Sequence, residues 1–216
     1  ILSFSDLPPE QLRFIALCCN VVVVSSGTLV FIKNNILNLK KAFPFVLTSI
    51  PMAFVGGSIH LPHFSFFVLL ASCLLISGIL MLKKQQEQPT PKSSKLLLNG
   101  LIGGAIGFVS GLVGIGGGIF LAPILYLLKW DRAHVIAATA SFFILVNSLA
   151  GLLGQSINGV PSVKWTILVP LLIAVAIGGQ IGSRLNMNHL SQLRVKRLTA
   201  ILVIFASLRI FYRLFG

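Results

Sequence analysis

The stretch Gly111–Pro123, GLVGIGGGIFLAP, places five glycines within eight residues and has apolar sequence on both sides. Consecutive glycines weaken an α-helix by about 1 kcal/mol each relative to alanine, and a proline follows them. The pattern therefore predicts a break in a hydrophobic helix. It is not a dinucleotide fingerprint, because the third glycine of that motif would fall at Ile119, and no Lys–Ser/Thr pair follows as in a phosphate loop.

The composition around this stretch is that of a membrane protein. The chain has 216 residues, of which 56% are hydrophobic and 10% charged, and its mean hydropathy is +0.96. Soluble domains carry about 25% charged residues. The net charge of +13 comes from 17 Lys and Arg against four acids, and the basic residues sit mostly in short loops. This distribution indicates the positive-inside rule and contact with anionic lipid rather than nucleic-acid binding.

Apolar segments run along most of the chain, and most are near the ~20 residues that a spanning helix needs. One segment, 119–129, has eleven residues and reaches only about half way across a ~30 Å hydrocarbon core. The segments are at about 14–32, 43–60, 64–82, 97–113, 119–129, 134–156, 165–183 and 195–214.

The loop charges predict a topology. Basic residues mark the loops near 33–41, 83–95, 129–132 and 184–197 as cytoplasmic, whereas the loop 60–63 has no Lys or Arg. These assignments agree with one another if 97–129 enters the membrane and returns to the same side. The sequence leaves open whether this segment is a hairpin of two spans or a re-entrant pair.

Two halves flank the polar linker 83–95, which we expect to be cytoplasmic. FIALCCN (14–20) aligns with VIAATAS (135–141), and FVGGSI (54–59) aligns with AIGGQI (176–181). Basic loops of one half match nearly neutral loops of the other, as inverted-topology repeats produce. The predicted fold is an all-α integral membrane protein, a polytopic helix bundle of two inverted-topology repeats (1–82 and 96–216) with a glycine-broken or re-entrant helix pair.

The glycines predict two different roles. Gly103, Gly107 and Gly111 recur every four residues, a spacing typical of close helix packing in membranes. The break itself leaves backbone groups that protein, water or a ligand must satisfy. Free N–H groups beside the positive end of the next half-helix form an anion-binding concavity. The break residues expected to bind a small anion are Gly114, Gly116, Gly117 and Gly118.

Polar side chains on two helices are the other candidates for this site. They lie on 134–156, directly after the break, and on the aligned helix 14–32. The alternative role is hydrogen bonding and packing between helices. The candidates are Thr139, Ser141, Asn147 and Ser148 on the first of these helices, and Asn20 and Ser26 on the second.

The motifs SGLVGIGGGIFLAPILYLL, AATASFFILVNSLAG and IGGQIGSRL resemble those of the sulfite exporter TauE/SafE family of membrane permeases. Residues 97–214 match the second repeat of that family well, and 13–82 match part of its first repeat loosely. The resemblance implies that the first repeat lacks its N-terminal glycine-rich hairpin here. It also implies transport of small sulfur anions, such as sulfite or organosulfonates, across the inner membrane.

The sequence therefore predicts an exporter or facilitator of small anions that works by alternating access around a glycine-lined midplane site. It is expected to be a multi-pass protein of the cell inner membrane that is surrounded by lipid. Its expected partner is a small anionic substrate and not a nucleic acid, and the sequence leaves open whether it forms homo-oligomers. An anion channel is the main alternative, followed by a non-transporting subunit or an intramembrane enzyme. No catalytic set, metal site or cofactor motif is visible, so we expect no enzyme.

Overall fold

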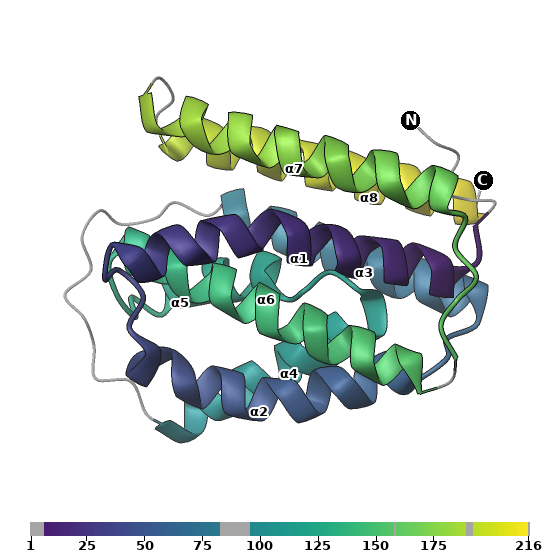
Figure 1. Ribbon diagram of the computed structural model, residues 1–216, viewed down its shortest axis with the longest axis horizontal. Helices are drawn as coiled ribbons and strands as arrows, with labels where there is room; N and C mark the ends of the chain where they lie inside the picture. The colour runs from purple at the N-terminus through teal and green to yellow at the C-terminus, as the bar shows by residue number, and fades with distance from the viewer. Residues whose placement is uncertain (1–6, 83–95, 158, 189–191, 216) are drawn as a thin grey trace.

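The computed structural model describes residues 7–82, 96–157, 159–188 and 192–215, with side chains described up to Ile181 and again from Arg197. Every regular element in these ranges is an α-helix (Figure 1). The described helices are α1 (Pro9–Lys33), α2 (Leu39–Ser58), α3 (His63–Leu82), α4 (Leu96–Val113), α5 (Gly118–Leu127), α6 (Ala133–Ser156), α7 (Trp165–Asn188) and α8 (Gln192–Phe215).

The helices follow the predicted apolar segments closely. Five of those described are long and apolar enough to cross a membrane, namely α1, α3, α4, α6 and residues 197–215 of α8. The apolar helix α5 and residues 165–181 of α7 are shorter. The predicted all-α, polytopic membrane fold is confirmed, whereas the division into two inverted repeats stays a prediction. The linker 83–95 lies outside the described residues.

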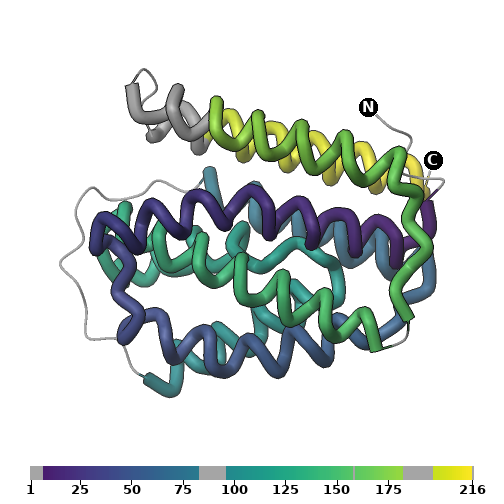
Figure 2. The backbone as a smooth tube through the Cα atoms, in the orientation of Figure 1, coloured from purple at the N-terminus to yellow at the C-terminus, as the bar shows by residue number. Residues whose placement is uncertain are grey.

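The helices run side by side along the long axis of the molecule (Figures 1 and 2). The pair α7 and α8 covers one side, where α7 packs on α1 and α8 packs on α3. On the far side α2 packs along α4, and α6 contacts α1, α2, α4 and α5. The helices α1 and α6, which carry the polar candidates, therefore meet inside the bundle.

Close backbone contact joins α2 to α4. Gly103, Gly107 and Gly111 face Phe45, Ser49 and Ala53 in turn, so the two helices run in the same direction. A Cβ at Gly107 would come within 2.7 Å of the Ser49 backbone, which leaves no room for a side chain. The predicted packing role of these glycines is confirmed.

The short helix α5 returns toward the end of the bundle where α2 begins. Its ten residues span about 15 Å, half of a ~30 Å hydrocarbon core. It ends in a turn with Lys129 in the left-handed region (φ 54°). Trp130 then packs on Phe45 of α2 with ring centroids 5.6 Å apart, and Asp131 pairs with Lys41 at 2.6 Å. The α4–α5 pair therefore enters and returns at one end of the bundle, with a helix of 18 residues and a half-helix.

Candidate functional site

The break between α4 and α5 is made of glycines that adopt left-handed backbone conformations. Gly114, Gly116 and Gly117 have φ values of 79°, 77° and 76°, a region that residues with a Cβ rarely adopt. The N–H of Gly114 still bonds the Ser110 carbonyl at 2.7 Å, and the Gly117 carbonyl accepts the first bonds of α5. Within the described chain, the amides of 115–119 donate to no backbone carbonyl. The break thus leaves a run of N–H donors, most of them buried, without backbone acceptors.

These donors coincide with the positive end of a helix. Gly117 is the N-cap of α5 and provides no side chain to cap it. The break lies beside Asn20, near the middle of the 25-residue α1. A helix N-terminus at this depth attracts negative charge, because the peptide dipoles sum to a partial positive charge there.

Side chains from α1 and α6 meet the break at Gly116. A Cβ built on Gly116 would lie 2.9 Å from Asn20 Nδ2 and 3.0 Å from Ser148 Oγ. At the next residue, Gly117, a Cβ would lie 3.2 Å from the Cβ of Ser110 on α4. The structure therefore brings together four elements, and two of the predicted side chains, Asn20 and Ser148, lie at the centre.

Several buried polar atoms on α1, α4 and α6 have no hydrogen-bond partner among the described residues, and Arg13, Ser110 and Ser148 among them lie against the break. Buried polar groups in proteins are nearly always hydrogen-bonded, so a cluster of orphans calls for an explanation such as a missing ion or ligand. Asn147 is fully buried with both side-chain atoms unpaired. The unpaired atoms are Arg13 Nε, Thr28 Oγ1, Ser110 Oγ, Thr139 Oγ1, Asn147 Nδ2 and Oδ1, Ser148 Oγ and Gln155 Oε1.

Three predicted side chains lie elsewhere on their helices. Ser26 follows Asn20 by six residues, about 240° around α1, and donates to the Val23 carbonyl at 3.2 Å. Thr139 precedes Ser148 by nine residues, on the opposite side of α6. Ser141 shares the Ser148 face but lies two turns away and is half-buried. Their roles in binding, like those of the other candidates, stay predictions.

Arg13 is a residue of this site that sequence reasoning missed. It is 3% exposed and lies against the break, where a Cβ on Gly114 would come within 2.5 Å of its Cγ. Its Nη2 donates to the Gly57 carbonyl at 2.7 Å, and its Nη1 donates to the carbonyls of Ile59 and Leu112 at 3.0 and 3.3 Å. Little in the sequence indicated this role. Arg13 directly precedes the apolar segment predicted to begin at residue 14, and an arginine in that position usually lies in solvent at the end of a helix.

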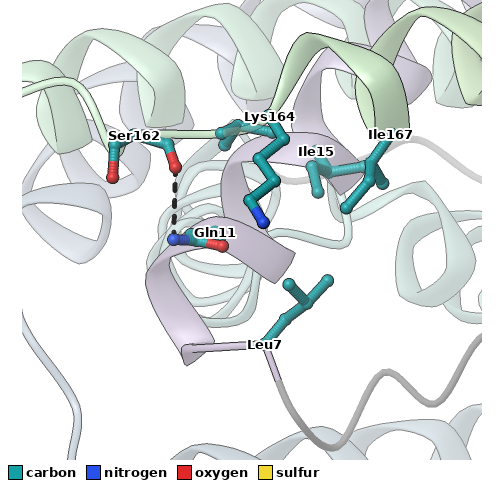
Figure 3. A pocket seen from close by; sticks show the side chains of 7 residues that line it. Leu7, Gln11, Ile15, Ser162, Lys164 and Ile167 are labelled. Atoms are coloured by element: carbon teal, nitrogen blue, oxygen red, sulfur yellow. Dashed lines mark hydrogen bonds between the residues drawn. The ribbon is translucent and has the colours of Figure 1, made fainter.

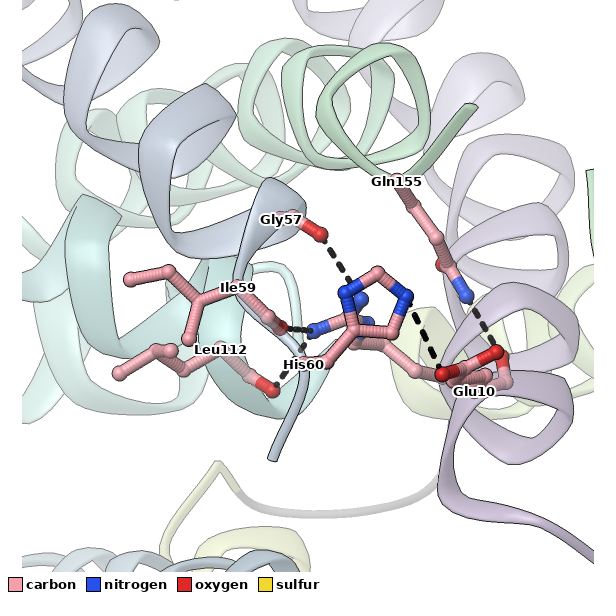
Figure 4. Close-up of polar contacts among 7 residues, drawn as sticks. Glu10, Gly57, Ile59, His60, Leu112 and Gln155 are labelled. Carbon is pink, nitrogen blue, oxygen red and sulfur yellow. Dashed lines mark hydrogen bonds and ion pairs between the residues drawn. The ribbon is translucent and has the colours of Figure 1, made fainter. Parts of the chain in front are cut away.

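Further polar contacts surround Arg13 at this end of the bundle (Figure 4). His60 Nε2 lies 3.2 Å from a carboxylate oxygen of Glu10, and both side chains are about half exposed. Gln155 of α6 donates its Nε2 to the Glu10 backbone carbonyl at 2.7 Å. The described residues contain no group of three or more potential metal ligands.

A small cavity opens beside the first turns of α1, toward the loop before α7 (Figure 3). Its volume is about 120 Å³, and Gln11 donates to the Ser162 carbonyl at its edge at 3.3 Å. The Lys164 side chain extends into it, so the cavity places a further cation near the end of α1 that holds Arg13. A second, wider pocket of about 370 Å³ lies at the other end, next to the ion pair of Lys41 and Asp131.

A bundle of apolar helices long enough to span a bilayer, with one helix broken, is the architecture of a multi-pass membrane protein. Comparison of the sequence with protein families identifies which one: the model of the sulfite exporter TauE/SafE family matches residues 1–210. The chain belongs to this family, and the match covers the first half as well as the second.

Two relatives are similar over nearly the whole chain. A protein of Sinorhizobium fredii named "Probable membrane transporter protein y4hK" is 32% identical over 98% of this chain and 87% of its own. "Probable membrane transporter protein YunE" of Bacillus subtilis is 23% identical over 99% of this chain and 85% of its own. No solved structure matches significantly. The family and these relatives indicate that the chain is a membrane transporter.

Proposed function

We propose that the protein transports small anions, of the sulfite or organosulfonate type, through a site at the glycine break. The unpaired, fully buried hydroxyl of Ser148 beside Gly116 carries this proposal. Burying a polar group without a partner costs about 1–3 kcal/mol, so a cluster of such groups is expected where a ligand completes the hydrogen bonds. The family to which the chain belongs supports sulfite as the first substrate to test.

The chemistry of the site favours an anion over a cation. The break offers backbone N–H groups, the N-terminus of α5, and the amide of Asn20 and hydroxyl of Ser148. Cation sites in membranes use carboxylates or carbonyls instead. The acids in the described chain, Glu10 and Asp131, both lie at helix ends, where Glu10 contacts His60 and Asp131 pairs with Lys41. Hydroxyl and amide donors without carboxylates suit a sulfur oxyanion.

The mechanism we propose is alternating access of two inverted halves around this midplane site, in the inner membrane and with the linker 83–95 in the cytoplasm. An inside-negative membrane potential drives an anion outward without a coupling ion. In this proposal the protein catalyses no chemical reaction and needs no cofactor. The chain works within lipid, either alone or as a homo-oligomer.

Replacing Ser148 by alanine tests this function, because it separates ligand binding from folding. The purified protein is reconstituted in proteoliposomes, and uptake of labelled sulfite is measured with sulfate and chloride as competitors. In the Ser148→Ala variant we expect a KM raised about 5- to 10-fold, the loss of one hydrogen bond to an anion. Thermal stability without substrate should stay the same or rise, because an unpaired buried hydroxyl has been removed.

The matched control is Ser207→Ala, at a serine that is equally buried but donates to the Ala71 carbonyl at 2.8 Å. This change should lower stability by about 1 kcal/mol and leave the KM unchanged. If wild-type protein shows no saturable anion uptake, the proposed function is wrong. Uptake that does not saturate at high sulfite would indicate the channel alternative.

A further inference from the structure

The faces of α1 and α6 that meet at the glycine break continue as a single antiparallel seam toward Arg13. Three contacts define it: Asn20 and Ser148 meet at Gly116, a Cβ on Gly151 would lie 3.4 Å from Leu17, and Gln155 bonds the Glu10 carbonyl. Along this seam the residue numbers rise on α1 as they fall on α6, so the two helices are antiparallel. Residues spaced by three and four share one helix face, so Arg13 occupies the face of Leu17 and Asn20.

The backbone of the break runs along this seam. Gly114 lies against Arg13, and Gly116 lies against Asn20. The seven residues between Arg13 and Asn20 correspond to about 10 Å along α1. Arg13 therefore lies at one end of the run of N–H groups that have no backbone acceptor. The proposed anion site at Gly116 is two residues further along the break.

Among the described residues no carboxylate bonds Arg13 directly, and Glu10, one turn away on α1, attracts it only at longer range. In the described part of the chain the salt bridges join Lys41 to Asp131 and His60 to Glu10, and neither includes Arg13. Its Nη groups instead bond carbonyls at the C-terminal ends of α2 and α4, where the helix dipoles are negative. Three carbonyls fix the guanidinium, but they supply no full negative charge.

One donor of the fixed guanidinium is left over. Arg13 Nε is buried and has no partner among the described residues. On the facing turn of α6, the Gln155 side chain is 3% exposed, and its Oε1 is also unpaired. The bond from Gln155 Nε2 to the Glu10 carbonyl fixes the orientation of this amide.

We propose that Arg13 is a substrate-binding residue, whose Nε and positive charge hold the transported anion at an outer station next to the glycine break. This proposal rests on the proposed transport function and adds a charged group to it. Arginine suits the role because its planar donors can bond helix carbonyls and an oxyanion at the same time. The alternative is that Arg13 only ties the ends of α2 and α4 together.

The test compares sulfite uptake and sulfite-induced thermal stabilisation in wild type, Arg13→Gln and Arg13→Lys, in the full chain. We expect the KM of Arg13→Gln to rise about 10- to 100-fold, as for the loss of a charged hydrogen bond. Arg13→Lys keeps the charge and should recover part of the affinity. The control is Arg209→Gln, because Arg209 is also an arginine in an apolar helix but is exposed, and its KM should stay at the wild-type value.

A second variant covers the case in which changes at Arg13 prevent folding. Glu10 is 46% exposed, so Glu10→Gln should fold, and it removes the negative charge one turn from Arg13. A bound anion would then experience a stronger positive field, and the KM should fall about 2- to 5-fold, the size typical of interactions between exposed charges.

The outcomes separate the two proposals. Suppose that the wild-type protein takes up sulfite and that Glu10→Gln and folded Arg13→Gln both have the wild-type KM. This result would overturn the role of Arg13 but leave the proposed transport function intact. A loss of stability in Arg13→Gln with a wild-type KM in the remaining folded protein would assign Arg13 to structure alone. Absence of both uptake and sulfite stabilisation in wild type would overturn both proposals.

Discussion

Helices α2 and α7 each carry a Gly–Gly pair that the predicted alignment of the two halves matches, yet the two pairs have opposite surroundings. A Cβ on Gly57 would lie 2.5 Å from the Gly151 carbonyl, and one on Gly56 would collide with the Phe108 carbonyl. Among the described residues, a Cβ on Gly178 would meet nothing within 4 Å, and one on Gly179 would meet only the Val23 side chain, at 3.5 Å. The same motif is a tight packing site in α2 and an open surface in α7.

The difference comes from the helices that face each pair. Gly56 packs on α4, and Gly57 packs on α6, so both lie where three helices cross. Helix α7 packs on α1, while Ile173, Ile177 and Ile181 on its outer face are more than half exposed. In a membrane, lipid can cover such an apolar face. A glycine pair in a sequence therefore permits close approach but does not create it.

The largest effect is expected at Gly57, where the contact is with backbone. Gly57→Ala should destabilise the protein by about 3 kcal/mol, because neither the Gly151 carbonyl nor α2 can shift without disturbing the packing of α6. Chemical unfolding in detergent measures the free energy. A loss below about 1 kcal/mol would mean that α2 and α6 lie further apart than described, and the contrast with α7 would fail.

The contrast extends to the start of the two helices. Lys41 in the first turn of α2 pairs with Asp131 at 2.6 Å, whereas Trp165 at the start of α7 is 74% exposed. Burial alone would raise the pKa of the Asp131 carboxyl, but the hydrogen bonds from Lys41 and the Arg132 N–H, with both positive charges, lower it below its usual value. The carboxylate thus interacts favourably in the folded state.

Because the folded pKa is lowered, the stabilisation is complete above the unfolded value of about 4 and is lost as the pH falls below it. Wild type should lose about 1 kcal/mol more than Asp131→Asn over this acid range, as for a partly exposed ion pair. Unfolding curves at a series of pH values measure the difference. Parallel pH profiles for the two proteins would show that the pair does not stabilise the end of α2.

The smallest effect is expected at Gly178 of α7, which aligns with Gly56 of α2. Gly178→Ala should stabilise the protein by up to about 1 kcal/mol, since alanine favours the helix and its methyl group would meet none of the described atoms within 4 Å. The shift in melting temperature of reconstituted protein measures it. A loss of stability comparable to that of Gly57→Ala would show that another helix packs on this face of α7 in the membrane. The contrast between the two glycine pairs would then fail.

The candidate site was only partly predictable from the sequence. The glycine break and its position between two apolar helices followed from local patterns, which also selected Asn20 and Ser148, the two side chains that lie beside Gly116. Ser26 and Thr139 were chosen from the same helices, but they lie on other faces, because spacing along a helix fixes angles without telling which face meets the neighbour. Arg13 was missed because its partners are backbone carbonyls 44 to 99 residues away in the chain.

By itself the sequence determined the helices and the place where one of them breaks, because hydrophobic length, glycine propensity and loop charge act locally along the chain. The tertiary structure decided which glycines are in contact and which polar groups remain unpaired. It also placed an arginine against the break, with three helix carbonyls around its guanidinium. Those features depend on which helix faces meet, and contacts between distant segments, unlike helix formation, carry no signal in any short stretch of sequence.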